Sequence, residues 1–426
     1  MVLTILLIII YVAFISLGLP DSLLGSAWPA MHVDIGVPIS YAGIVSMIIA
    51  GGTIVSSFFS DKIIRKLGTG IVTAISVSMT AIALLGFSIS NEFIYLCLWA
   101  IPLGLGAGSI DAALNNFVAL HYKAKHMSWL HCFWGVGAMT GPIIMSYCLE
   151  KGAFFQLGYR VVAIIQFILV AILVIALPLW KKIKLSSKND VTIQLENQQL
   201  TNQECTTVNN QISSKIENQE KLSENVQEHK VLSVKELLQL PGAKQVLIAF
   251  FCYCAIEATT GLWGSSFMVT QRGISAETAA RWTSLFYFGI TFGRFLSGFV
   301  TMKLNHKQMI RLGEIIILLG VIALLLPFGN LVLCAGFILI GLGCAPIYPS
   351  LLHETPVNFG AEYSQSIMGI QMSCAYIGST FMPPFFGILA SKISYAIMPF
   401  FTGGLLILMI VMIELLNKRI AHKNIA

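Results

Sequence analysis

Runs of about twenty apolar residues recur along the whole chain. A helix needs that length to cross a hydrocarbon layer of about 30 Å, and a backbone in lipid must satisfy its own hydrogen bonds. The sequence therefore predicts an all-α membrane protein with twelve transmembrane helices. The helices are expected near residues 4–27, 39–60, 69–89, 93–120, 128–149, 159–180, 245–269, 277–302, 308–328, 330–351, 364–389 and 395–417.

The charge content excludes a water-facing fold. Of the 426 residues, 56% are hydrophobic and 11% are charged, whereas soluble domains carry about 25% charged residues. The net charge of +6 comes from short Lys and Arg clusters between the apolar runs, which predicts contact with a lipid bilayer and not with nucleic acid. The nine cysteines have no metal-ligand spacing, so we expect neither a metal nor a cofactor.

Basic residues alternate between the loops. Lys and Arg follow the second, fourth, sixth and eighth apolar runs and the last run, whereas residues 31–40 and 90–92 have none. Arg272 and Arg281 are exceptions in a loop of the basic-poor set. Because cytoplasmic loops are enriched in Lys and Arg, both termini are expected in the cytoplasm of a multi-pass protein of the cell membrane.

A polar segment divides the apolar runs into six and six. Residues 184–230 are rich in Asn, Gln, Glu, Ser and Lys, and they have too few apolar residues to build a core, so a disordered cytoplasmic linker is expected. The predicted domains are an N-terminal six-helix bundle at 1–183, this linker, and a C-terminal six-helix bundle at 231–426. A short amphipathic helix at the membrane surface is expected to open the C-terminal domain.

The two halves of the chain resemble each other. Leu23–Trp28 matches Leu262–Phe267, and Gly104–Ala107 matches Gly341–Cys344 at a nearly constant offset. Duplicated halves related by an axis along the membrane normal occur in secondary transporters, which bind their substrate between the halves. The repeat therefore predicts two six-helix pseudo-repeats around a central site.

The loop after the second apolar run resembles a motif of a known superfamily. Ser57–Gly68 is similar to the Gly-x-x-x-Asp-Arg/Lys-x-Gly-Arg-Arg loop of the major facilitator superfamily, with serine in place of the first glycine. The resemblance implies that superfamily's twelve-helix fold and a conformational gate at Asp61, Lys62 and Arg65. We also assign Arg294 to the gate, because it is expected near the cytoplasmic end of the eighth run.

Segments inside the apolar runs resemble one family of that superfamily. Gly104–Asn116 is similar to the fourth helix of the fucose–galactose–glucose:proton symporter family, with Asp111 and Asn115 where that family has Glu-x-x-x-Asn. Further similar segments are Leu19–Asp21, Ser128–Gly135, Phe292–Arg294, Ala345–Pro349, and Tyr253-x-x-x-Glu257 followed by Trp263. The resemblance implies proton-coupled symport of a sugar or similar small polar solute by alternating access.

Few ionisable residues lie within the apolar runs, and the candidates for chemistry among them are Asp21, Asp111, His131, Glu257 and Arg294. A charge in lipid is costly, so these side chains are expected to face the bundle interior. Desolvation favours the protonated form of a carboxylate, which is what proton coupling requires. We expect Asp111 to be the principal proton-coupling acid and Asp21 to contribute to proton or substrate binding.

Candidate substrate-binding residues occur in both halves. Asn115 lies one helical turn from Asp111 and faces the same way. Glu257 is the candidate of the second half, with Trp263 as a stacking platform for the apolar face of a sugar. Weaker polar candidates are Asn116, Gln371 and His131. For each of these residues, the alternative is a structural contact between helices.

Two other functions remain open from the sequence. An exporter of metabolites or drugs, working as an antiporter, is the first, because Gly135, Gly137 and Gly141 in the fifth run partly resemble the antiporter motif of drug exporters. A transporter-like receptor or a membrane enzyme is the second. The topology brings together no Ser-His-Asp set, no metal cluster and no phosphate-binding loop, so we do not expect an enzyme. The expected partners are a small solute, protons and the bilayer, and the carrier is expected to work as a monomer.

Overall fold

The structure is a computed structural model that describes residues 2–122, 124–151, 154–205 and 234–423. Almost all of these residues are helical. The N-terminal half contains α1 (Val2–Asp21), α2 (Leu23–Ile35), η1 (Ile39–Tyr41), α3 (Ala42–Leu67), α4 (Thr69–Ile89), α5 (Phe93–His121), α6 (Ala124–Glu150) and α7 (Phe155–Cys205). The C-terminal half contains α9 (Val234–Leu237), α10 (Ala243–Arg272), α11 (Ala276–Val300), α12 (His306–Leu325), α13 (Asn330–Phe359), α14 (Ala361–Lys392), η2 (Tyr395–Ile397) and α15 (Met398–Lys423).

The described helices confirm the predicted all-α membrane fold. Eleven helical spans are long and apolar enough to cross a membrane, and the first of them combines α1 and α2. Helix α11 has the length of a span, with 25 residues. It carries Glu277, Arg281 and Arg294, which lower its mean hydropathy, and it completes the predicted set of spans.

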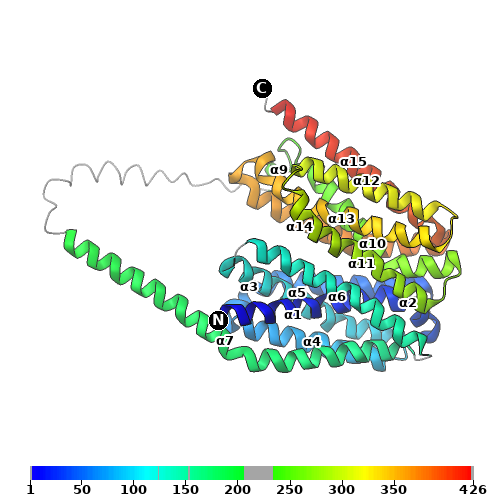
Figure 1. Cartoon of the computed structure of the whole chain (residues 1–426), viewed down its shortest axis with the longest axis horizontal. Helices are drawn as coiled ribbons and strands as arrows, with labels where there is room; N and C mark the ends of the chain where they lie inside the picture. The colour runs from blue at the N-terminus through cyan, green and yellow to red at the C-terminus, as the bar shows by residue number, and fades with distance from the viewer. Residues whose placement is uncertain (1, 123, 152–153, 206–233, 424–426) are drawn as a thin grey trace.

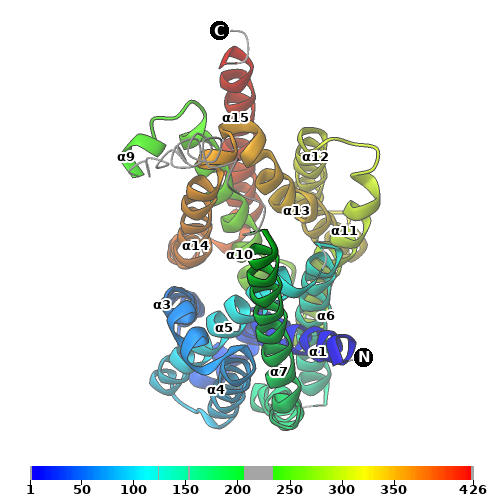
Figure 2. The same cartoon turned by 90° about the vertical axis from the view of Figure 1, so that its left-hand side faces the viewer.

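The helices form two bundles that lie side by side. Seen along the bundle in Figure 2, α1 and α3–α7 form one group and α10–α15 form the other. Across the interface α6 packs against α11, α3 against α14, and α2 against α10. The two bundles approach each other most closely at the end opposite the termini, and they diverge toward the end where the termini lie (Figure 1).

Glycines allow the two halves to touch at the backbone. A Cβ atom at Gly25 of α2 would lie 2.3 Å from the carbonyl oxygen of Gly261 in α10. A Cβ atom at Gly43 of α3 would lie 2.7 Å from the Cα atom of Pro384 in α14. Small residues at such positions are typical of membrane helices whose backbones pack closely. These contacts bring α2 and α3 of one half against α10 and α14 of the other.

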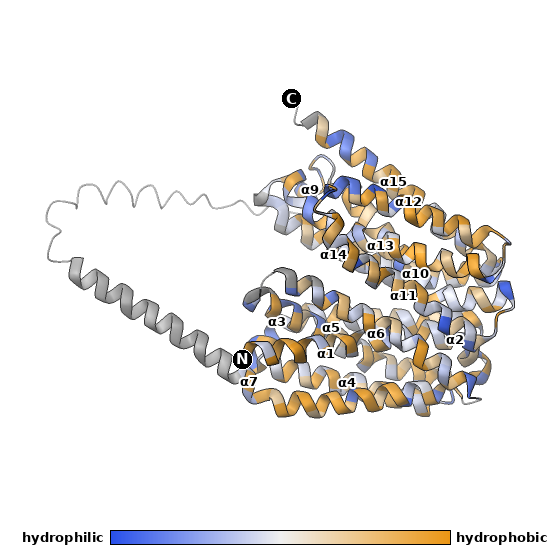
Figure 3. Cartoon of the chain, viewed as in Figure 1, coloured by the Kyte–Doolittle hydropathy of each residue, from blue (hydrophilic) through white to orange (hydrophobic). Residues whose placement is uncertain are grey.

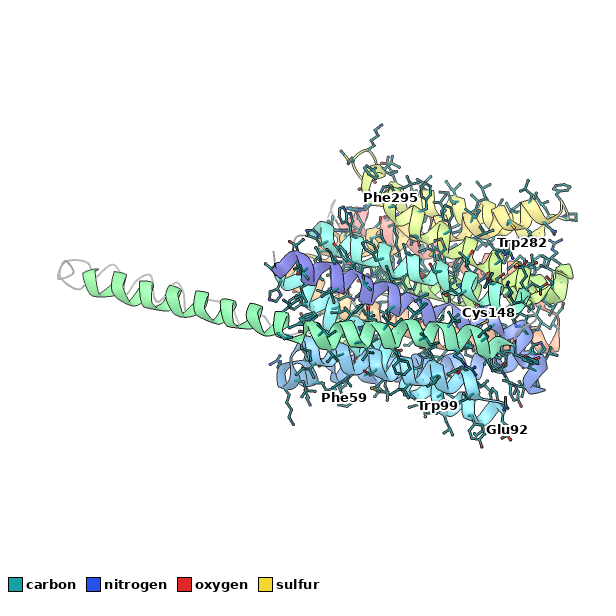
Figure 4. The ribbon with its side chains drawn as sticks, turned by 60° about the horizontal axis from the view of Figure 1, so that its bottom comes forward. Phe59, Glu92, Trp99, Cys148, Trp282 and Phe295 are labelled. Carbon is teal, nitrogen blue, oxygen red and sulfur yellow. The ribbon has the colours of Figure 1, made fainter. Side chains whose placement is uncertain are left out.

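The outer surface of the bundle is apolar. Hydrophobic residues cover the long helices, whereas hydrophilic residues concentrate toward the two ends of the bundle (Figure 3). Phe59 of α3 and Phe295 of α11 point outward, with 47% and 54% of their surface exposed (Figure 4). Glu92, in contrast, lies in the loop between α4 and α5 at the end of the bundle. This distribution fits a protein whose sides face hydrocarbon and whose ends face water.

The described part of the predicted linker continues the last helix of the N-terminal half. Residues 184–205 belong to α7, which ends at Cys205. Gln, Glu, Lys and Leu are good helix formers, and extending an existing helix needs no new nucleus. Residues 206–230 of the predicted linker lie outside the described residues. The expected surface helix is reduced to one turn, α9, in which Leu237 is buried.

Candidate functional site

A cavity of about 470 Å³ lies between the two halves. Helices α1, α2, α3, α5 and α6 line it on one side, and α10, α11, α13 and α14 line it on the other. Ligand sites of small molecules usually measure about 300–1,000 Å³ and combine apolar walls with a few convergent polar groups. The dimensions and position of this cavity therefore fit a small solute held between the two bundles.

Asp21 lies where the first span is interrupted. It is the last residue of α1, and α2 begins after Ser22. Pro20 precedes it and lacks the backbone N–H that a continuing helix would use. The indole Nε1–H of Trp134 on α6 donates a hydrogen bond of 2.7 Å to Oδ2 of Asp21. The carboxyl group is thus fixed at the cavity by a neutral donor.

Asp111 lines the same cavity from α5. The amide Nδ2 of Asn115, one turn further along the helix, donates a 2.9 Å hydrogen bond to its Oδ1 atom. The side-chain amide oxygen of Asn115, Oδ1, is buried, and it has no hydrogen-bond partner among the described residues. Asn115 itself is not one of the cavity-lining residues, so its contact with the site runs through Asp111.

Glu257 on α10 has a different environment, because a cation accompanies it. Nη2 of Arg294 on α11 lies 3.8 Å from its Oε1 atom. The hydroxyl of Tyr253, one turn earlier on α10, donates a short hydrogen bond to its Oε2 atom. The Arg294 guanidinium carbon also lies 5.2 Å from the ring centroid of Trp134, within cation–π range. Arg294 therefore contacts both halves of the molecule.

Tyrosines dominate the wall that the C-terminal half supplies. They are Tyr253 on α10, Tyr287 on α11, Tyr348 on α13 and Tyr376 on α14. The Tyr253 and Tyr348 ring centroids are 5.9 Å apart, and the Tyr348 hydroxyl donates to Sδ of Met372 at 3.2 Å. In the internal repeat Tyr348 corresponds to Asp111, and both residues line the cavity. The repeat therefore places unlike side chains at equivalent positions of the two walls.

The structure brings most of the predicted ionisable residues together. Asp21, Asp111, His131, Glu257 and Arg294 all line the cavity. Arg294 was assigned to the gate, but the structure places it in the cavity wall. It lies nearly two turns before the end of α11, and its helix face is directed at α6 and α10. Only 19% of its side chain is exposed.

Besides Asn115, three of the predicted substrate-binding residues do not line the cavity. Trp263 is fully buried, and its Nε1–H donates to the carbonyl oxygen of Pro383 at 2.8 Å, which links α10 to α14. It follows Glu257 by six residues, which is a rotation of about 240° around the helix, so the two side chains face different ways. Gln371 is fully buried and accepts a 3.1 Å hydrogen bond from Thr355. Asn116 is exposed on α5 and does not line the cavity.

The predicted gate residues of the first half lie at the end of α3. Lys62 and Arg65 are exposed there, close to the end of the helix at Leu67. The side chain of Asp61 lies outside the described part of the structure. The gate therefore stays a prediction.

Sequence reasoning missed several cavity residues. Tyr253 was visible in the spacing Tyr253-x-x-x-Glu257, because residues four apart share a helix face. Trp134 stood in a recognised segment, but nothing in that segment separates an indole at the cavity from one at the lipid. Tyr287 and Tyr376 gave no signal, since aromatic residues are common in apolar runs. In the part of the chain that the structure describes, no group of three or more His, Cys, Asp or Glu side chains could hold a metal ion.

Two six-helix bundles around a central cavity define a membrane carrier. The family model described as Major Facilitator Superfamily matches residues 10–280 and 245–425. The chain therefore belongs to the Major Facilitator Superfamily, which confirms the superfamily that the loop motif indicated. The finer resemblance to the fucose–galactose–glucose:proton symporters stays a prediction.

Two curated relatives match long parts of the chain. The glucose/mannose transporter GlcP of Bacillus subtilis is 22% identical over 344 residues, which cover 80% of this chain and 77% of that protein. Bypass of stop codon protein 6 of Saccharomyces cerevisiae is 24% identical over 307 residues, which cover 70% of this chain and 57% of that protein. The match thus spans little more than half the length of the yeast relative.

Solved structures share the fold across nearly the whole chain. The peptide transporter POT in complex with sulfate superposes with a TM-score of 0.69 at 14% identity, covering 97% of this chain and 94% of that chain. A mutant of the nucleoside transporter NupG gives 0.66 at 14% identity, covering 96% and 98%. At this identity the likeness extends to the fold alone.

Proposed function

We propose that this chain is a proton-coupled carrier that moves a sugar or a similar small polar solute across the membrane by alternating access. The observation that carries this proposal is the cavity between the halves, in which the carboxyl groups of Asp21 and Asp111 face a wall of tyrosines. The similarity to the glucose/mannose transporter GlcP supports the choice of a sugar. The cavity lining alone would accept any neutral polar solute of that size.

The chemistry of the lining matches a polyhydroxylated solute. Hydroxyl groups can donate to the carboxylates of Asp21, Asp111 and Glu257 and accept from Arg294. The tyrosine rings offer apolar faces with a polar edge, as the C–H face of a sugar ring requires. Without a proton on Asp21 or Asp111, the four charged groups of the cavity sum to a negative charge, which disfavours an anionic solute.

Proton coupling is assigned to the N-terminal half. Asp21 and Asp111 are bonded to neutral donors, Trp134 and Asn115, so either acid can take up a proton without breaking an ion pair. Glu257 is instead accompanied by Arg294. We assign the principal coupling role to Asp111 and a contributing role to Asp21. Coupling follows if solute and proton both favour the same conformational state.

The contacts between the halves support alternating access. Nη2 of Arg281 on α11 lies 2.6 Å from Oε2 of Glu150 on α6, at the end opposite the termini. The backbone contact of Gly25 with Gly261 also joins the halves. The described state is thus closed at one end, and transport requires these contacts to open as the halves rock. The alternation of basic loops supports a cell-membrane protein with both termini in the cytoplasm.

Uptake into reconstituted vesicles tests the proposal. A panel of radiolabelled sugars is offered with and without a pH gradient, to the native chain and to Asp111→Asn. We expect at least one sugar to accumulate only with the gradient, and Asp111→Asn to lose that accumulation. If no sugar accumulates, the symport proposal is wrong. Accumulation that depends on sodium and not on pH would replace the coupling ion.

A further inference from the structure

One indole ring contacts groups from both halves of the cavity. The edge of Trp134 donates to Asp21 at 2.7 Å. The face of the same ring lies 5.2 Å from the guanidinium carbon of Arg294. Asp21 and Trp134 belong to the N-terminal half and Arg294 to the C-terminal half, and α6 and α11, which carry the indole and the guanidinium, pack against each other across the interface.

Arg294 forms no hydrogen bond with its acidic neighbour, Glu257. At 3.8 Å its nitrogen lies beyond hydrogen-bond distance of the Glu257 oxygen. Glu257 instead accepts its short hydrogen bond from the hydroxyl of Tyr253. The guanidinium therefore has the Trp134 face on one side and, on the other, the Glu257 carboxylate together with the Tyr253 hydroxyl, with which it forms a hydrogen bond.

We propose that Trp134 and Arg294 form the link through which protonation of Asp21 in the N-terminal half is transmitted to Glu257 in the C-terminal half. The inference rests on the proposed proton-coupled transport. It makes Arg294 a positioning residue that acts on the solute site through Glu257.

The strength of the hydrogen bond between Trp134 and Asp21 depends on the charge of the Asp21 carboxyl group. A hydrogen bond to a carboxylate is about twice as strong as one to a neutral acceptor. Donation to a charged acceptor also polarises the donor, which strengthens the attraction of the indole face for a cation. A proton on Asp21 weakens both effects, so it loosens the indole and releases Arg294 toward Glu257. The contact between Trp134 and Arg294, which joins the halves, is then lost. Arg294 neutralises the charge of Glu257 beside the solute more fully.

The other ionisable groups on the cavity set the background for this link. Asp111 on α5 is the second acid, and like charges disfavour the ionisation of both acids at once. His131 on α6 and Tyr287 on α11 also line the cavity. Asp111 is therefore kept native in the test, so that a partial loss of coupling reports on the link and not on the loss of the principal coupling acid.

The test compares Trp134→Phe and Arg294→Lys with the native chain. Phenylalanine keeps an aromatic face but lacks the donor to Asp21, and lysine keeps the charge but lacks the planar fork. Reconstituted protein is assayed with the best sugar of the panel for accumulation driven by a pH gradient, and for exchange of labelled against unlabelled sugar without a gradient. The matched control is Trp129→Phe, because Trp129 lies on the same helix but is exposed.

We expect both variants to lose accumulation by roughly tenfold more than they lose exchange, as loss of one charge-assisted contact predicts. The pH at which KM for exchange changes should also shift in both variants, whereas Trp129→Phe should match the native chain. Equal losses of accumulation and exchange would show a structural role and overturn the inference. Native coupling and a native pH profile in both variants would overturn it as well. A native chain that shows no pH dependence would overturn the proposed function itself, and with it this link.

Discussion

The two walls of the cavity come from the same six-helix repeat, but their side chains differ in chemistry. The N-terminal half contributes Asp21 and Asp111, each bonded to a neutral donor. The C-terminal half contributes tyrosines and one acid, Glu257, that has a cation beside it. Asp111 and Tyr348 occupy equivalent places in the internal repeat. Equivalent positions of the repeat thus line the cavity in both halves, whereas the two acids that are bonded to neutral donors lie on one wall.

This difference leads us to assign separate roles in transport to the two walls. An acid without a cation partner changes charge when it binds a proton, which suits coupling. An acid beside a cation can form charge-assisted hydrogen bonds that hold a solute hydroxyl in a fixed orientation. The N-terminal wall is therefore assigned to the proton and the C-terminal wall to the solute. Four predictions test this comparison, from the largest expected effect to the smallest.

The first prediction contrasts the acids of the two walls. Asp111→Asn should lose accumulation driven by a pH gradient far more than exchange, because it removes the titrating group. Glu257→Gln should keep part of the dependence on the gradient, because Asp111 is intact, and should raise KM by roughly tenfold or more, since a hydrogen bond to a charged group contributes about 1.5–3 kcal/mol. Initial rates of uptake and exchange across a range of sugar concentrations measure both effects. The same defect in both variants would contradict the division.

The second prediction concerns the tyrosine equivalent to Asp111. Tyr348→Ala removes an aromatic face worth about 0.5–1.5 kcal/mol, which corresponds to a rise in KM of roughly two- to tenfold. The dependence on the pH gradient should be unchanged. Tyr348→Phe keeps the ring and serves as the matched control, with a smaller rise. A loss of coupling in Tyr348→Ala would mean that the C-terminal wall also handles the proton.

The third prediction separates a buried tryptophan from the site. Trp263→Phe leaves the carbonyl oxygen of Pro383 without its donor, at a cost of about 1–3 kcal/mol. We expect a lower melting temperature in detergent with KM within about twofold of the native value. Trp129→Phe should change neither quantity. A large rise in KM with unchanged stability would instead support the prediction that Trp263 stacks on the sugar.

The fourth prediction addresses the closed end of the bundle. The side chains of Arg281 and Glu150 are 53% and 57% exposed, and exposed ion pairs contribute about 0–1 kcal/mol. Glu150→Gln should therefore shift the balance of states by at most roughly fivefold. Thiol labelling of Cys254, which lines the cavity, measures this shift as a changed reaction rate in a chain whose other cysteines are replaced by serine. A rate equal to that of the native chain at low and high salt would show that the pair does not hold this end closed.

Much of the fold followed from the sequence, because apolar runs near twenty residues leave a chain few alternatives in lipid. The acids of the cavity were also predictable, since a charge in an apolar run must face the interior. What could not be predicted was which way each aromatic residue faces. Trp134 lies at the cavity and Trp263 away from it, and this choice depends on the rotation of each helix against its neighbours. The break at Ser22, which fixes Asp21, likewise became visible only in the structure.

The central claim is that the N-terminal wall takes up a proton together with the solute. Its most direct test is the pH of a lightly buffered medium around reconstituted vesicles while a transported sugar flows inward without any imposed gradient. We predict that the medium becomes alkaline with the native chain and with Glu257→Gln at saturating sugar, and that Asp111→Asn gives no such change. Sugar entry by the native chain without any change in pH would contradict the claim.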